Sequence, residues 1–134
     1  MKADIEVPKV EGIRIAIVPS NPDNLEDLWE VYIMNQNSYR VDTVLINSKG
    51  YGDKDGLRQV TSTMRRMIEV LPGSSYGMFE SIDPDVFHLT NEYFVTYYKD
   101  GKIYDKNFVF VPETIIKENL IDIELIGKKG VLHD

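Results

Sequence analysis

The sequence predicts an all-β protein, an immunoglobulin-like antiparallel β-sandwich of about seven or eight strands. Three observations lead to this fold class: apolar residues alternate with polar ones in several short segments, one hairpin signal is strong, and turn-forming residues separate the segments. We found neither an internal repeat nor a linker, so we expect residues 1–134 to form a single β-sandwich domain. A chain of 134 residues with 43% hydrophobic content can bury a core.

The strongest local signal is a hairpin centred on Asp100-Gly101. Aromatic and β-branched residues flank this pair, and Asp-Gly readily adopts the positive φ angles of a type I′ turn. A two-residue loop places Tyr97 opposite Tyr104 and Tyr93 opposite Phe108. A type I turn with a bulge gives a different register, and the sequence leaves that choice open.

Residues 12–47 predict three more strands. Residues 12–18 have an isoleucine at every second position, which is the period of a half-buried strand. Residues 28–34 alternate with Trp29 and Ile33 on one face, and the pattern resumes over 39–47 after a polar break. We therefore expect residues 28–34 and 39–47 to form a second antiparallel pair.

The middle of the chain gives mixed signals. Residues 48–56 contain three glycines and two aspartates and predict a loop. The apolar residues of 57–71 fit either a helical stripe or one face of a strand, and the β-branched run at 61–63 favours the strand. Residues 76–82 predict another strand, and Asp83-Pro84 can cap a single helical turn.

The C-terminal third leaves a second alternative open. Residues 112–120 begin with Pro-Glu and fit a short C-terminal helix, whose apolar stripe would include Ile115 and Leu120. Such a helix would cover the outer aromatic residues of the hairpin. Residues 121–126 and 131–132 are compatible with a last small hairpin.

The immunoglobulin-like version of the sandwich depends on Tyr93. Tyr93 lies two positions before Val95. Val95 occupies the inter-sheet position where an antibody domain has a cysteine, and a tyrosine two residues before that position is the arrangement of a tyrosine corner. The chain has no cysteine. The pattern therefore indicates an architecture and does not identify a family.

Composition excludes several classes of protein. No segment approaches the run of about 20 apolar residues that spans a bilayer, and residues 1–8 are too charged for a signal peptide, so we expect a cytoplasmic protein without membrane contact. The absence of cysteine and the presence of only two histidines exclude disulfides, thiolate catalysis and most metal sites. We expect no cofactor and no metal. A net charge of −7 argues against nucleic acid as a partner.

Three short patterns suggest chemistry, and each has a simpler structural interpretation. Residues 73–77 match the G-x-S-x-G nucleophile elbow around Ser75, but a strand is expected after them instead of a helix. Asp53 and Asp55 resemble half of a calcium loop, for which a solvated hairpin tip is the better interpretation. For His88 we expect a partly buried structural side chain, and for His133 a mobile tail. We assign no catalytic, cofactor-binding or metal-binding residue.

Six segments resemble those of a known family over nearly the full length of the chain. They are residues 11–18, 47–52, 61–65, 91–93, 101–106 and 128–132. The chain thereby resembles a family of small bacterial proteins without an established activity that are often labelled as the phenylalanyl-tRNA synthetase α subunit. The residues do not support that label, because the ATP-binding motifs of a class II synthetase cannot be placed here. The resemblance implies no catalytic residues.

The hairpin carries aromatic residues on both faces, and one sandwich core cannot bury both sets. Tyrosine is enriched in protein interfaces, and a neighbouring segment offers basic side chains. The sequence therefore favours a non-enzymatic, cytosolic protein-interaction module that forms a homodimer or binds another protein. The alternative is a small-molecule-binding or catalytic protein, hydrolase-like or tRNA-linked, with a pocket at one end of the sandwich. The candidate interaction residues are Phe94, Tyr98, Tyr104, Arg65 and Arg66.

Overall fold

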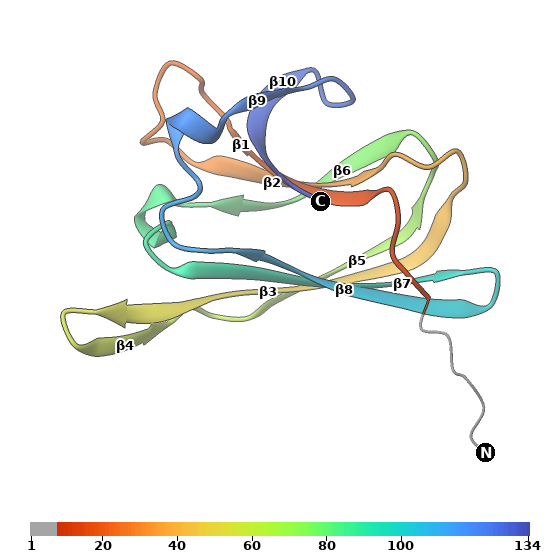
Figure 1. Ribbon diagram of the computed structural model, residues 1–134, viewed down its shortest axis with the longest axis horizontal. Coiled ribbons are helices and arrows are strands. Elements are labelled where there is room, and N and C mark those ends of the chain that lie inside the picture. Colours follow the sequence, from red (N-terminus) through yellow and green to blue (C-terminus); the bar gives the residue numbers. More distant parts are fainter. Residues whose placement is uncertain (1–7) are drawn as a thin grey trace.

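The computed structural model describes residues 8–134, which form two antiparallel sheets facing each other (Figure 1). The prediction of an all-β sandwich is confirmed, although the described residues form ten strands instead of seven or eight. The prediction that residues 1–8 are not a signal peptide falls mostly outside the described residues, which begin at residue 8. The elements are β1 (Ile13–Pro19), β2 (Trp29–Asn35), β3 (Val41–Lys54), β4 (Leu57–Val60), β5 (Met64–Leu71), β6 (Ser75–Ile82), η1 (Pro84–Val86), β7 (Thr90–Lys99), β8 (Lys102–Phe110), η2 (Lys117–Asn119), β9 (Ile121–Ile123) and β10 (Lys128–His133).

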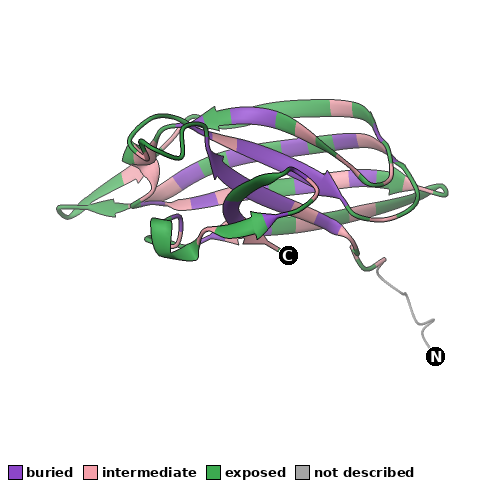
Figure 2. Ribbon diagram, turned by 90° about the horizontal axis from the view of Figure 1, so that it is seen from above, coloured by how far each residue is buried: buried purple, intermediate pink, exposed green. Residues whose placement is uncertain are grey.

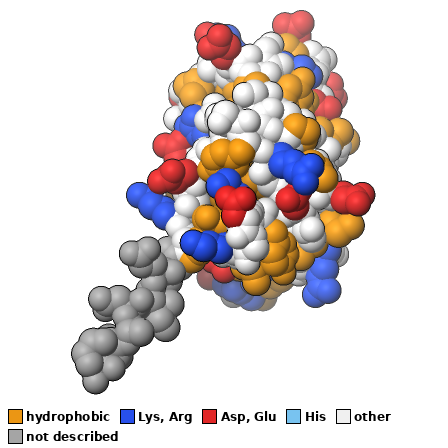
Figure 3. Space-filling view, turned by 90° about the vertical axis from the view of Figure 1, so that its right-hand side faces the viewer, with side chains coloured by type: hydrophobic (Ala, Val, Ile, Leu, Met, Phe, Trp, Pro, Cys, Tyr) orange, Lys and Arg blue, Asp and Glu red, His pale blue; other side chains and the backbone are white. Residues whose placement is uncertain are grey.

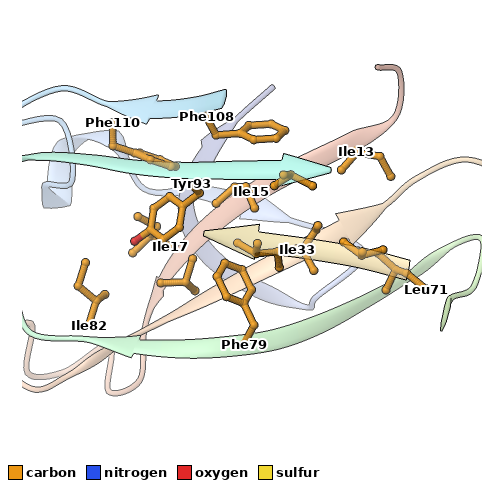
Figure 4. Close-up of a cluster of buried hydrophobic side chains, with 14 of the residues drawn as sticks. Ile13, Ile15, Ile17, Ile33, Leu71, Phe79, Ile82, Tyr93, Phe108 and Phe110 are labelled. Atoms are coloured by element: carbon orange, nitrogen blue, oxygen red, sulfur yellow. The ribbon is translucent and has the colours of Figure 1, made fainter. Parts of the chain in front are cut away.

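Each sheet has five strands. The first, which we call sheet A, has the order β6-β2-β1-β10-β9. In the second, sheet B, β8, β7 and β3 are neighbours, and β4 and β5 both pair with the other edge of β3. The two sheets enclose the main core, in which Ile15, Ile33, Tyr93 and Phe108 are fully buried (Figure 4). Buried and exposed residues alternate along much of β3 and β7, as the period of two requires, whereas β1 and β2 are buried on both faces (Figure 2).

The hairpin at Asp100-Gly101 is confirmed. Asp100 and Gly101 have φ angles of 52° and 73°, and both values are those of a type I′ turn. The two-residue loop decides between the two registers that the sequence left open, and Tyr97 pairs with Tyr104. It also pairs Tyr93 with Phe108.

The predicted pairing of residues 28–34 with 39–47 is wrong, because β2 lies in sheet A and β3 in sheet B. The buried side chain of Asn35 explains the crossing. Its Nδ2 donates hydrogen bonds to the carbonyl oxygens of Tyr39, Leu71 and Pro72 at 2.9, 3.1 and 3.1 Å. One amide thus holds the β2–β3 and β5–β6 connections together at the same corner, and both connections change sheets.

The loop predicted for residues 48–56 is also wrong, because β3 continues to Lys54 and the chain reverses only at Asp55 and Gly56. These two residues have φ angles of 53° and 75° and form a tight turn. Gly50 lies within β3, opposite Asn91 of β7. A Cβ atom at this position would lie 3.1 Å from the Oδ1 atom of Asn91. Gly50 and Gly52, which contributed to the loop prediction, therefore allow close approaches within the sheet, and only Gly56 serves the turn.

Residues 57–71 form strands, as the β-branched run favoured, but they form two. The break between β4 and β5 falls at residues 61–63, the same run that favoured a strand. The N–H of Thr61 donates to the carbonyl oxygen of Gly50 at 2.8 Å, and its Oγ1 accepts from the N–H of Gly50 at 2.7 Å. Thr61 therefore satisfies the backbone N–H and C=O groups of Gly50 at the point where the strands that pair with this edge of β3 are interrupted.

The alternative of a short C-terminal helix is wrong. Residues 112–120 run in an extended path with one 3-10 turn, η2, and they carry the chain from sheet B to sheet A. Ile115 points into the main core between the sheets. This segment consequently leaves the outer aromatic residues of the hairpin uncovered. The small final hairpin is present as β9 and β10.

Candidate functional site

Two surfaces of the described residues have functional potential, and the first is the outer face of sheet B. Strands β3, β5, β7 and β8 place five large apolar side chains there, each between 40% and 62% exposed. Leu45 pairs with Met67 on one side and with Thr96 on the other, and Tyr98 pairs with Ile103, so the set crosses the sheet. We call Leu45, Met67, Phe94, Tyr98 and Ile103 the sheet B patch.

Charged side chains surround hydrophobic ones at the end of the molecule where the β7–β8 hairpin turns (Figure 3). Seen from that end, hydrophobic side chains gather on the lower side, which belongs to sheet B, among Lys, Arg, Asp and Glu (Figure 3). Arg65 lies on the β5 side of the outer face, because it pairs with Asn47, the neighbour of Phe94. Asp105 lies on the β8 side and pairs with Thr96. Arg65 and Asp105 thus place one charge of each sign on opposite sides of this face.

The structure places three of the five candidate interaction residues on this face, namely Phe94, Tyr98 and Arg65. Tyr104 lies on the inner side, stacked on Tyr97 with ring centroids 5.1 Å apart. Arg66 reaches the neighbouring sheet, where its Nε donates to the carbonyl oxygen of Phe79 at 3.1 Å.

Leu45 and Met67 were missed by sequence reasoning. The alternation of residues 39–47 contained the signal for Leu45. Met67 could not be assigned to a face while its segment fitted both a helix and a strand.

The second surface is a pocket of about 210 Å³ between the two sheets, whose mostly apolar wall carries a few polar side chains. A β-bulge creates it. Val31 pairs with Glu80 but Tyr32 pairs with Met78, so Phe79 is the extra residue and both Phe79 and Glu80 turn inward. Glu80 is only 9% exposed, and its Oε1 accepts a hydrogen bond from the hydroxyl of Ser48 on β3 at 2.7 Å. We call this cavity the Glu80 pocket.

Burial controls the electrostatics of the Glu80 pocket. It raises the pKa of Glu80, and the hydrogen bond from Ser48 and the positive charge of Arg66 only partly oppose this effect. Tyr93 also lines the pocket, and burial together with the charge of Glu80 raises the pKa of its hydroxyl. Among residues 8–134 this hydroxyl makes no hydrogen bond, although a tyrosine corner would bond it to the backbone.

The G-x-S-x-G pattern begins in the turn between β5 and β6, as its simpler interpretation required, and its residues 75–77 already belong to β6. The hydroxyl of Ser75 donates to the carbonyl oxygen of Pro72 at 2.5 Å, and no helix follows that would expose a nucleophile. Asp53 and Asp55 lie at the solvated end of the β3–β4 hairpin.

Both histidines differ from their predicted environments. His88 is exposed instead of partly buried, and its Nε2 lies 2.7 Å from the Oε1 of Gln59. His133 is the end of β10 and not a mobile tail, because its ring packs edge-on against Phe108 and Phe110 at 5.3 and 5.4 Å. Within residues 8–134, no three His, Asp or Glu side chains gather in a way that could hold a metal ion.

Comparisons with protein-family models, with curated proteins and with solved structures give no match for this chain. In residues 8–134, no helix has the length and apolar character needed to cross a membrane.

Proposed function

We propose that this protein is a non-enzymatic cytoplasmic interaction module that binds a second copy of itself through the sheet B patch. The observation that carries this proposal is the patch itself, in which four adjacent strands leave five large apolar side chains at least 40% exposed. Contiguous apolar surface of this kind marks interaction sites, because leaving it in water costs free energy.

The arrangement of charges favours a second copy as the partner. In a two-fold dimer whose axis runs parallel to the strands between two facing sheets, β5 of one copy lies over β8 of the other. Arg65 of one copy then approaches Asp105 of the other, since these residues lie on neighbouring rows of the same face. Tyr98 and Phe94 lie on β7, near the axis. Aromatic residues near the centre of an interface commonly supply most of its binding energy.

Sedimentation equilibrium on Tyr98→Asp tests the proposal. The charge would be buried without a partner in the dimer, so we expect the dissociation constant to rise at least about tenfold. Tyr76→Asp is the matched control, because Tyr76 is a tyrosine of similar exposure on β6 of the other sheet and should leave assembly unchanged. A monomeric native protein contradicts the proposal, as does a folded Tyr98→Asp protein that assembles like the native one.

We also propose that the sandwich is immunoglobulin-like in topology. The neighbours β1-β2-β6 correspond to strands A, B and E of that fold, and β8-β7-β3 correspond to G, F and C. The crossings at β2–β3, β5–β6 and β6–β7 support this assignment. Superposition of an experimental structure on immunoglobulin-like domains is the test. Failure to align β2, β3, β6 and β7 together would reject the assignment.

A further inference from the structure

We infer that the Glu80 pocket binds a small primary amine as its ammonium ion, independently of the sheet B patch. The two surfaces share no residue, because the patch covers the outer face of sheet B and the pocket lies between the sheets. Loss of one function would therefore leave the other intact.

The first argument is the cost of placing a carboxyl group between two sheets. Glu80 is nine-tenths buried, and no Lys or Arg of the described residues lies within 4 Å of its carboxylate. Its one hydrogen bond, from Ser48, uses Oε1. The charge of Arg66 acts on this carboxylate only from beyond that distance and does not offset its burial. A buried carboxylate without a cation in direct contact is costly, and a bound ammonium ion would supply that contact.

The second argument is the unused hydrogen-bonding capacity in the same pocket. Tyr93 is 1% exposed as a whole residue and lines the pocket, and its hydroxyl makes no hydrogen bond within residues 8–134. It is not a fully buried orphan, because in this part of the chain that description applies to Nε of Arg14. Asn91, also buried, donates through Nδ2 to the carbonyl oxygens of Val86 and Leu89 at 3.1 and 3.2 Å. Its Oδ1 accepts no hydrogen bond within that described part of the chain. An ammonium group has three donors, and Glu80, Tyr93 and Asn91 offer three acceptors.

Charge and size narrow the class of ligand. Asp83 adds a second acid to the lining, whereas the one lining cation, Lys49, is paired with Glu92 at 3.8 Å. Met64, Ile82 and Val86 supply an apolar wall. A benzene-sized ligand occupies a cavity of about 150 Å³, so this pocket suits about five to eight non-hydrogen atoms. A four- or five-carbon alkyl chain with one ammonium group fits that size and that lining.

Titration with n-butylamine hydrochloride, followed by protein NMR, tests the inference. We expect saturable shifts at Ser48, Glu80 and Asn91, and much weaker binding of n-butanol and butyrate, which lack the positive charge. Nα-acetyl-lysine methylamide is a second probe, and tighter binding of this compound than of butylamine would identify a lysine side chain as the source of the amine. Failure of both amines to bind up to about 100 mM overturns the inference.

Glu80→Gln is the decisive variant, because glutamine retains an oxygen that can accept the Ser48 hydrogen bond. We expect it to weaken butylammonium binding at least about tenfold, and Tyr93→Phe to weaken it several-fold. Glu69→Gln, which removes an exposed acid from β5, is the control and should leave binding unchanged. Equal affinity in Glu80→Gln and the native protein overturns the inference.

The thermal stability of Glu80→Gln separates a binding site from a purely structural role. If Glu80 serves ligand binding, its charged form opposes folding of the ligand-free protein, because burial raises its pKa. Glu80→Gln should then melt at a higher temperature than the ligand-free native protein near neutral pH. A lower melting temperature together with unchanged butylammonium binding in Tyr93→Phe would assign Glu80 to a structural tie between the sheets and reject the binding site.

Discussion

The outer faces of the two sheets begin with similar sequence patterns and end in different environments. On sheet A, the outward side chains of Ala16, Val18, Tyr32 and Met34 form a second core with Ile123 and Ile126. Strands β9 and β10 arch over that face (Figure 1). On sheet B, no described segment of the chain buries the patch in the same way.

This difference shows that an apolar outer face has two possible fates in a sandwich. The C-terminal segment can cover sheet A because β10 pairs with β1 and continues the sheet, and the short turn that leads from β9 into β10 places β9 beside β10 over the face. No comparable extension leaves sheet B, whose last strand, β8, is followed by the crossing to sheet A. The uncovered face is therefore the one available to a partner.

The largest expected effect tests the covered face. Ile123→Ala removes a buried side chain from the second core and should lower the free energy of unfolding by about 2–5 kcal/mol, measured by urea denaturation. Ile103→Ala, in the sheet B patch, should change it by no more than about 0.5 kcal/mol. Equal losses in the two variants would remove the distinction between the faces.

A second prediction tests how closely β10 must approach β1. A Cβ atom on Gly130 would lie 2.7 Å from Cγ2 of Val18 and 3.0 Å from the carbonyl oxygen of Ile17. Gly130→Ala should therefore cost about 1–3 kcal/mol of stability in the same assay. Gly77→Ala on β6 is the matched control, because its nearest neighbour would be at an ordinary 3.5 Å. If both substitutions are neutral, the cover over sheet A is looser than the contacts indicate.

A third prediction tests the uncovered face at its most exposed member. Met67→Asp should weaken self-association at least about tenfold in sedimentation equilibrium and leave the melting temperature almost unchanged. Leu57→Asp, on β4 and even more exposed, should affect neither. Equal weakening by Leu57→Asp would indicate a general effect of charge on association and not a specific patch.

The smallest expected effect is the pH dependence of stability that His133 causes. This residue ends β10, the strand that joins β9 to β1 of sheet A. Burial, together with the positive charge of Lys106, lowers the pKa of His133 below its usual 6.5. The folded state therefore binds fewer protons than the unfolded state, and the native protein should lose stability as the pH falls below about 6.5. In thermal melts over this range, His133→Phe should show a smaller loss than the native protein. An identical pH profile for the two proteins would contradict this role.

Local signals explain why much of the fold was predictable. The hairpin at Asp100-Gly101 was predicted, because the turn residues and the flanking alternation depend only on neighbours in sequence, whereas the choice between its two registers was left to the structure. The error at residues 28–47 has the opposite origin. Two consecutive strands look the same in sequence whether they pair or change sheets, and only the contacts of Asn35 with Leu71 and Pro72 decide between these outcomes.

The candidate sites divide in the same way. Phe94 and Tyr98 were predicted for an exposed face because alternation separates them from Tyr93 and Tyr97. The Glu80 pocket was not predicted, since one extra residue in a bulge reverses the face of the side chain and leaves no periodic signal. Tyr104 was included among the candidate interaction residues because the sequence pattern does not show which face of the hairpin the opposite sheet covers.

The sequence by itself determined the all-β class, the position of the β7–β8 hairpin, and a strand instead of a helix after Ser75, because backbone preferences and side-chain alternation act over a few residues. Tertiary structure alone decided which strands change sheets, which outer face is covered, and that Glu80 faces Ser48 across the sandwich. Those outcomes depend on contacts between residues far apart in the chain, such as Glu80 with Ser48 and Ile123 with Val18, whose favourable free energy arises only when the two sheets have come together.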